Sequence, residues 1–129
     1  VAGQMVKTML KRRIQVDGAR VLVLGLTFKE NCPDLRNTRI IDVIAELQDF
    51  GVVVDVHDPW ADAAAAKHEY GHDLVATPQA DTYDGIILGV AHDEFRAMGT
   101  AQLRSFGRDG HVLYDLKSML PAADSCIRL

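Results

Sequence analysis

The stretch RVLVLGLTFKENCPDLRNTRIIDVIAELQDFG, residues 20–51, contains a complete strand–loop–helix unit and decides the fold. It begins with an unbroken run of Val and Leu, which is typical of a strand that is buried on both faces. Further on, Ile40, Ile44 and Leu47 share one face of a helix that a glycine can end. A buried strand followed by an amphipathic helix is the unit from which parallel α/β sheets are built.

The rest of the chain repeats this alternation. Further strands are predicted at residues 52–58, 73–77, 85–91, 111–116 and 126–129. A helix is predicted at residues 60–71, and two short helical pieces at 92–99 and 100–107. The sequence therefore predicts an α/β fold, a three-layer Rossmann-like domain with a mainly parallel sheet and helices on both faces.

The first residues carry a separate helical pattern. Val1, Met5 and Met9 recur near helical spacing, and no capping residue precedes them. We expect residues 1–16 to be the end of a long connecting helix and residues 17–129 to be the domain itself. On its own, the apolar stripe of that helix is expected to be exposed and to promote self-association.

Composition excludes several classes of partner. The chain has 129 residues and a net charge of −4, which argues against a nucleic-acid-binding surface. No apolar run approaches the ~20 residues that a membrane helix needs. The two cysteines, Cys32 and Cys126, are far apart and match neither a metal site nor a disulfide scaffold. We therefore expect a cytoplasmic protein without a bound metal.

The loop at residues 25–38 is the strongest candidate for a ligand site. Ligands of open parallel sheets bind outside the carboxyl ends of the strands, where this loop begins. Lys29 and Arg36 lie next to the predicted start of a helix, whose free N–H groups favour an anion. Two cations and a helix start predict a phosphate-binding pocket. The alternative is that Glu30 and Asp34 simply pair with these cations on the surface, and spacing alone favours neither reading.

Two other strand ends carry polar residues with structural explanations. We expect Asp58 to cap the helix that follows it, and Trp60 to pack over that helix. We expect Asp93 to cap the next helix, with His92 in a partly exposed loop.

The last strand end and the cysteine complete the candidates. Lys117, which follows Asp115, is either a third cation for a ligand or a solvated turn residue. Cys32 lies near cations, but no base is close in sequence, so an inert thiol is favoured over a nucleophile. No strand is followed by G-x-G-x-x-G, so a dinucleotide site on this chain alone is not expected.

Residues 20–60 strongly resemble the C-terminal domain of the UDP-glucose/GDP-mannose dehydrogenase family. The resemblance rests on the G-x-x-F-K pattern at 25–29, the D-x-R pattern at 34–36, and Asp58-Pro59. The form LTFKENCPDLRNT is most similar to the branch that oxidises UDP-N-acetylhexosamines, and DLKSM at 115–119 fits the family's final substrate contact.

This resemblance implies an activity for the complete protein. The family oxidises the C6 hydroxyl of a UDP-sugar to a carboxylate with two NAD, through a cysteine thiohemiacetal and thioester, for surface polysaccharide biosynthesis. That cysteine and the main NAD site belong to N-terminal and central domains that residues 1–129 do not include. No catalytic residue is therefore expected in this chain, and the family likeness implies a homodimer built on the connecting helix.

The resemblance also implies roles for individual residues. Phe28, Lys29 and Lys117 correspond to substrate-binding positions, and Arg36 corresponds to a position on the NAD side. The Lys117 assignment departs from the Asp-Gly-Arg form of the UDP-glucose branch, in which an arginine stands at this position. The rival interpretation is a stand-alone α/β module for nucleotide sensing or regulation.

Overall fold

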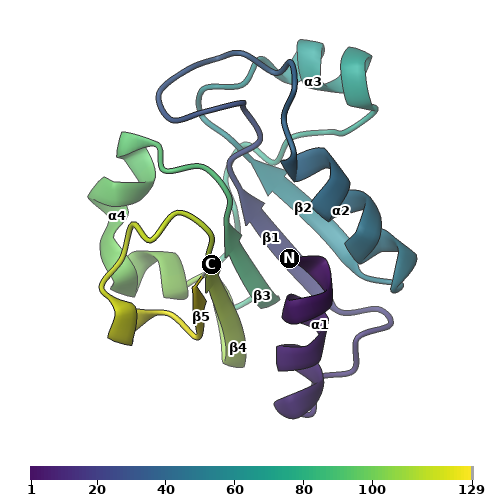
Figure 1. Ribbon diagram of the computed structural model, residues 1–129, viewed down its shortest axis with the longest axis vertical. Coiled ribbons are helices and arrows are strands. Elements are labelled where there is room, and N and C mark those ends of the chain that lie inside the picture. Colours follow the sequence, from purple (N-terminus) through teal and green to yellow (C-terminus); the bar gives the residue numbers. More distant parts are fainter. Residues whose placement is uncertain (129) are drawn as a thin grey trace.

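A computed structural model describes residues 1–128 and shows one sheet between two layers of helices (Figure 1). The strands follow the order β2-β1-β3-β4-β5, and every neighbouring pair is parallel. They are β1 (Arg20–Leu24), β2 (Val53–His57), β3 (Tyr83–Leu88), β4 (Gly107–Asp115) and β5 (Ile127–Arg128). The predicted three-layer α/β fold with a mainly parallel sheet is confirmed.

The helices cover both faces of the sheet. One layer contains α1 (Ala2–Lys11), α2 (Ile40–Asp49) and α3 (Ala63–Tyr70), and the other contains α4 (Asp93–Arg104) and the short η1 (Ala122–Asp124). Because side chains alternate along a strand, Val21 and Val23 join the first core and Leu22 and Leu24 join the second. This double burial explains why the strand sequence is apolar without alternation.

Helix α1 packs against the sheet of its own chain. Met5 and Met9 are fully buried, and a Cβ atom added to Gly85 of β3 would lie 2.2 Å from the Met5 methyl carbon. The missing side chain at Gly85 thus leaves the space that Met5 fills. The expected exposure of the whole stripe is wrong, although Leu10 remains 58% exposed.

One predicted strand is missing from the sheet, whereas the two predicted short helical pieces and the edge strand are present. Residues 73–77 form no strand of the sheet, since only Leu74 makes an isolated bridge to Val56. The carbonyl of Val75 is instead bound by the His57 ring. The two helical pieces predicted at 92–99 and 100–107 are present within α4, because Gly99, with a non-helical φ of 74°, separates them by a kink. The predicted edge strand at 126–129 is present as β5, and Leu129 lies outside the described residues.

The order of the strands creates a crevice at their carboxyl ends. From β1 the chain crosses to α2 on one face, whereas from the neighbouring β3 it crosses to α4 on the other. Loops that leave in opposite directions open a space between them. At its base, the Gly89 N–H donates to the Leu24 carbonyl at 2.9 Å. A Cβ atom at Gly25 would lie 2.6 Å from that of Val90, so this close approach requires glycine.

Candidate functional site

A hollow of about 240 Å³ occupies this crevice. Its walls come from Thr27 and Phe28 after β1, from residues 37–40 at the start of α2, from Gly89 and Val90 after β3, and from Lys117 after β4. The ends of three strands therefore contribute to one pocket, as the strand order predicts.

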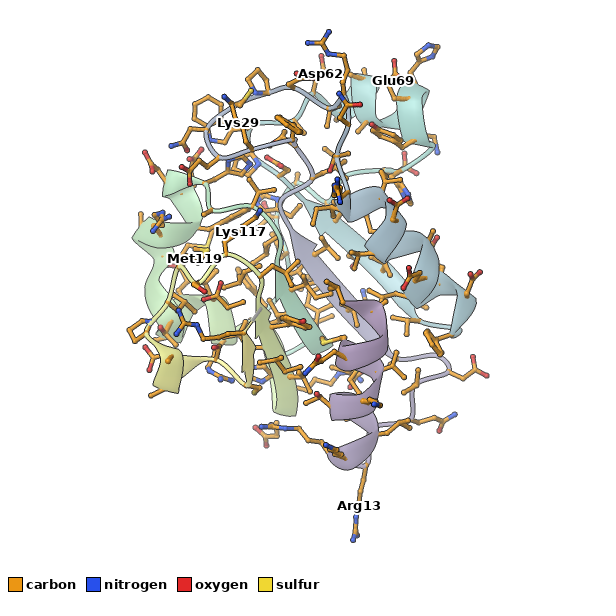
Figure 2. All side chains as sticks on the ribbon, in the orientation of Figure 1. Arg13, Lys29, Asp62, Glu69, Lys117 and Met119 are labelled. Atoms are coloured by element: carbon orange, nitrogen blue, oxygen red, sulfur yellow. The ribbon has the colours of Figure 1, made fainter. Side chains whose placement is uncertain are left out.

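A second hollow of about 240 Å³ adjoins the first, and Phe28 and Lys117 line both. Lys29 lines the second hollow together with Ala91 and Arg96. In Figure 2, Lys117 lies below Lys29, and Arg13 lies at the far end of the molecule. The structure thus places Phe28, Lys29 and Lys117 around the same two hollows.

The start of α2 adds a cation that sequence reasoning missed. Arg39 is the N-terminal flanking residue of α2 and lines the first hollow. Its side chain has no hydrogen bond or ion pair within residues 1–128. Thr38 accepts the Ile40 N–H at 3.3 Å, and the helix start adds a partial positive charge. Its position, one residue before the apolar face of α2 begins, could have identified Arg39 from the sequence.

Arg36 lies outside both hollows. It lines a different hollow with Pro33 and Tyr70, and its side chain is 86% exposed. The guanidinium pairs with Asp34 at 3.0 Å, and these hydrogen bonds lower the pKa of the Asp34 carboxyl. The predicted grouping of Lys29 with Arg36 is therefore wrong, because the intervening loop turns Arg36 toward α3.

The surface-pairing alternative holds for only half of the loop. Asp34 pairs with Arg36, as that alternative expects. Glu30, however, pairs with Arg96 of α4 at 3.7 Å rather than with Lys29. Within residues 1–128, Lys29 makes no ion pair, so its ammonium group stays available to a ligand.

Asp58 does not cap the following helix, because Asp62 holds that position by accepting the Ala64 N–H at 2.9 Å. The Asp58 carboxylate is buried and accepts backbone N–H groups of Leu26 at 2.6 Å and Thr27 at 3.0 Å. Burial raises the pKa of Asp58, but hydrogen bonds from His92 and the backbone outweigh it and leave the pKa below its usual value. Asp58 therefore anchors, as a carboxylate, the start of the loop that follows β1.

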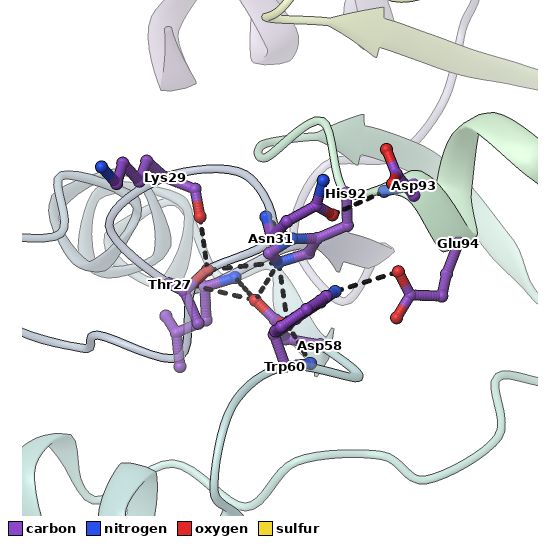
Figure 3. A network of polar contacts seen from close by, with 9 residues as sticks. Thr27, Lys29, Asn31, Asp58, Trp60, His92, Asp93 and Glu94 are labelled. Carbon is purple, nitrogen blue, oxygen red and sulfur yellow. Dashed lines mark hydrogen bonds and ion pairs between the residues drawn. The ribbon is translucent and has the colours of Figure 1, made fainter.

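His92 is fully buried, which contradicts the expected partly exposed position. Its ring stacks on Trp60 with centroids 6.0 Å apart and contacts Asp58 at 2.9 Å (Figure 3). His92 itself flanks the start of α4, so Asp93 is the first helical residue rather than the cap. Trp60 packs against His92 and α4 rather than over α3 as predicted, and its indole N–H donates to Glu94 at 2.9 Å.

Asp115 shapes the turn that presents Lys117. Its buried carboxylate accepts N–H groups of Lys117 at 3.1 Å, Met119 at 3.2 Å and Leu120 at 2.9 Å. Ser118 in this turn has a φ of 51°, a left-handed conformation that is uncommon for a residue with a side chain. Lys117 thus stands on a hydrogen-bonded support at the mouth of the first hollow.

Residues 22–122 match the model of the UDP-glucose/GDP-mannose dehydrogenase family, UDP binding domain. The chain belongs to this family. A UDP-N-acetyl-D-glucosamine 6-dehydrogenase from Pseudomonas aeruginosa is 58% identical over 129 residues. Another from Salmonella typhi is 52% identical over 129 residues. Both alignments cover 100% of this chain, which spans only 31% and 30% of the length of these relatives.

The fold agrees with this family assignment. A solved structure of a UDP-glucose dehydrogenase from the archaeon Pyrobaculum islandicum matches with a TM-score of 0.71 and 28% sequence identity. The match covers 98% of this chain and 28% of that chain. The likeness thus extends over nearly the whole of this UDP binding domain.

Other kinds of site are not found in the described part of the UDP binding domain. Residues 1–128 contain no group of three or more His, Cys, Asp or Glu side chains arranged to hold a metal ion. Within the same residues, no helix combines the length and the apolar character needed to cross a membrane. Cys32 is a free, partly exposed cysteine.

Proposed function

We propose that this chain is the UDP-sugar-binding domain of an NAD-dependent nucleotide-sugar 6-dehydrogenase, whose substrate is a UDP-N-acetylhexosamine. The observation that carries the proposal is the gathering of Phe28, Lys29 and Lys117 around two adjoining hollows at the strand ends. The names and 52–58% identities of the two relatives favour the N-acetylhexosamine class.

In this proposal the lysines bind the diphosphate. Lys29 and Lys117 supply mobile ammonium groups, Arg39 supplies a planar fork, and the start of α2 supplies backbone N–H groups. A hydrogen bond to a charged group contributes about 1.5–3 kcal/mol. Phe28 is 53% exposed at the boundary between the hollows, so its ring offers an apolar surface to the base or sugar.

The oxidation that we propose for the complete enzyme removes two hydrides from the C6 carbon and adds one oxygen from water. Two molecules of NAD, bound in turn, would each accept one hydride. Residues 1–128 offer no glycine-rich turn of the dinucleotide-binding type, so this domain does not form the main NAD site. Arg36, exposed and outside the hollows, is proposed to contact NAD from the substrate side.

The remaining parts of the proposal concern the complete enzyme. The N-terminal and central domains would supply the cysteine nucleophile, because Cys32 has no hydrogen-bonded base in the described part of the chain. We further propose a cytoplasmic homodimer whose product serves surface polysaccharide biosynthesis. Sedimentation of the complete enzyme tests the dimer, and a monomer at micromolar concentration would refute it.

The alternative is a stand-alone module that senses nucleotides. The same cationic hollow would serve such a module, because the hollow needs no catalytic residue to bind a diphosphate. The length of the natural open reading frame separates the two. A frame of about this length would favour the module, and a frame about three times longer would favour the enzyme.

Replacing Lys29 or Lys117 by alanine in the complete enzyme tests the proposed function. Loss of one charged contact worth about 1.4 kcal/mol or more corresponds to at least roughly a tenfold rise in KM for the UDP-sugar. Lys67→Ala is the control, because Lys67 lies on α3, pairs with Asp73, and lines neither hollow. Unchanged KM values in both lysine variants would refute the assignment.

A further inference from the structure

A buried histidine lies directly beneath the candidate binding loop, which is defined here as residues 27–31. His92 and Asp58 are both buried, and neither has a role in the proposed binding of the UDP-sugar. The loop above them is exposed at Phe28 and Lys29. A histidine that merely filled the core would bond to core elements, so the partners of the ring decide what it does.

Hydrogen bonds to the ring define its protonation state. The backbone N–H of Asn31 points at Nδ1 of His92 at 2.9 Å. Because an N–H group can only donate, Nδ1 must be the unprotonated acceptor. The ring proton therefore sits on Nε2, which lies 3.0 Å from Oδ2 of Asp58 and 3.2 Å from the Thr27 hydroxyl. Each nitrogen of the neutral ring has a partner suited to it.

These partners lie at the two ends of the binding loop. Thr27 contacts Nε2, and its hydroxyl donates to the Lys29 carbonyl at 3.2 Å. Asn31 binds Nδ1 through its N–H, and its side-chain oxygen accepts the Asp93 N–H at 2.9 Å (Figure 3). The φ of Asn31 is 53°, a left-handed conformation that asparagine tolerates well. The loop thus closes around one imidazole ring.

We propose that His92 is a positioning residue that clamps residues 27 and 31, and thereby holds Phe28 and Lys29 over the hollows. The inference rests on the proposed function, because it assigns His92 a part in UDP-sugar binding through Lys29. Lys117 is held independently, by the Asp115 carboxylate at the end of β4. The clamp therefore acts on one of the two lysines and not on the other.

Two substitutions of similar size test the contacts of the two ring nitrogens separately. His92→Asn places an oxygen near the Nδ1 position and retains an acceptor for Asn31, whereas His92→Gln retains a donor near the Nε2 position. Each variant loses one buried hydrogen bond, so both should lower Tm to a similar extent. Only His92→Gln should release the Asn31 end of the loop.

The first readout is limited trypsin digestion of the complete enzyme without ligand, followed by mass spectrometry. We expect His92→Gln to speed cleavage after Lys29 at least about tenfold, since proteolysis follows the population of the opened segment. Cleavage after Lys117 should keep its wild-type rate. His92→Asn should resemble the wild type at both bonds.

The second readout is a double-mutant cycle on KM for the UDP-sugar. Lys29→Ala should raise KM by about tenfold in the wild type and by less than about threefold in His92→Gln, because coupled residues are not additive. Lys117→Ala should raise KM equally in both backgrounds. KM for NAD should not change in His92→Gln.

The outcomes distinguish this inference from the proposed function. An unchanged rate of cleavage after Lys29 in His92→Gln would overturn the clamp. Equal cleavage rates in His92→Asn and His92→Gln, with fully additive effects of His92→Gln and Lys29→Ala on KM, would likewise show that His92 is purely structural. If Lys29→Ala left KM unchanged while His92→Gln still sped cleavage, the loop clamp would stand. The proposed function of Lys29 would then fail.

Discussion

At the scale of single residues, two arginines near the same loop should have different tasks. Arg39 lines the first hollow without a protein partner among residues 1–128, whereas Arg36 is paired with Asp34 outside it. We predict that Arg39→Ala raises KM for the UDP-sugar and leaves KM for NAD unchanged. Arg36→Ala should do the reverse. Steady-state kinetics with each substrate varied in turn checks both predictions. A raised KM for the UDP-sugar in Arg36→Ala, with no such rise in Arg39→Ala, would contradict the placement of the two arginines.

Asp58 should make the stability of the domain depend on pH. The pKa of Asp58 is lower in the folded state than in the unfolded chain. Its carboxylate therefore stabilises the fold fully above the unfolded pKa of about 3.9, and this stabilisation is lost as the pH falls through the folded pKa. We predict that Asp58→Asn lowers the free energy of unfolding by about 1–3 kcal/mol near pH 7. This difference from the wild type should shrink below about pH 4.

Urea unfolding of the wild type and the variant between pH 3 and pH 7 measures this difference. The matched control is Asp73→Asn, because the Asp73 side chain is 84% exposed and, among residues 1–128, pairs only with Lys67. It should show no measurable change in stability. A constant difference between Asp58→Asn and the wild type down to pH 3 would argue against a lowered pKa at Asp58.

At the scale of elements, the junction of β1 and its loop should be intolerant of side chains. Gly25 has a φ of 105°, and an added Cβ would lie 2.7 Å from the Val90 nitrogen. We predict that Gly25→Ala lowers the free energy of unfolding by about 1–3 kcal/mol or more. Gly3→Ala is the control, because nothing lies within 4 Å of its added Cβ and α1 would gain a better helix former.

Thermal unfolding of both glycine variants gives the answer. Gly25→Ala should lower Tm by several degrees, at about 4–8 °C per kcal/mol for a domain of up to roughly 100 residues and somewhat less for a longer one. Gly3→Ala should hold or raise Tm. Equal Tm values for the two variants would mean that the chain relaxes easily at the base of the crevice.

The turn after β4 offers a second prediction at this scale. Asp115→Ala removes the acceptor of three backbone N–H groups, so it should lower Tm and also raise KM for the UDP-sugar by displacing Lys117. Lys117→Ala should raise KM without lowering Tm, since Lys117 is exposed. Differential scanning fluorimetry and kinetics on the same samples separate these effects.

Most elements follow from local patterns in the sequence, because strands buried on both faces and amphipathic helices each have a distinct periodicity. The unbroken apolar runs around Leu22 and Ile86 are typical of central strands, and both form such strands. The predicted strand at residues 73–77 is wrong. A short apolar run does not show how many of its residues can pair with a neighbouring strand, and here only Leu74 forms a bridge, to Val56. The covering of the α1 stripe depends on Gly85, more than seventy residues away in sequence from the helix.

At the scale of the whole molecule, the family and the grouping of Lys29 with Lys117 could be predicted from the sequence, but the placement of Arg36 and His92 could not. Lys29 and Lys117 stand far apart in the chain and meet only because β1, β3 and β4 are neighbours. Arg36 follows Lys29 closely in sequence, yet the loop turns it to another face. His92 looked like a surface residue because its burial depends on Trp60 and Asp58 from a different strand end.

The central claim is that Lys29 and Lys117 bind the diphosphate of a UDP-sugar at the strand ends. Calorimetric titration of the complete enzyme with UDP and with uridine tests it most directly. Each lysine-to-alanine variant should weaken UDP binding by roughly tenfold or more, and should leave uridine binding unchanged because uridine carries no phosphate. Equal affinities of wild type and variants for UDP would contradict the account.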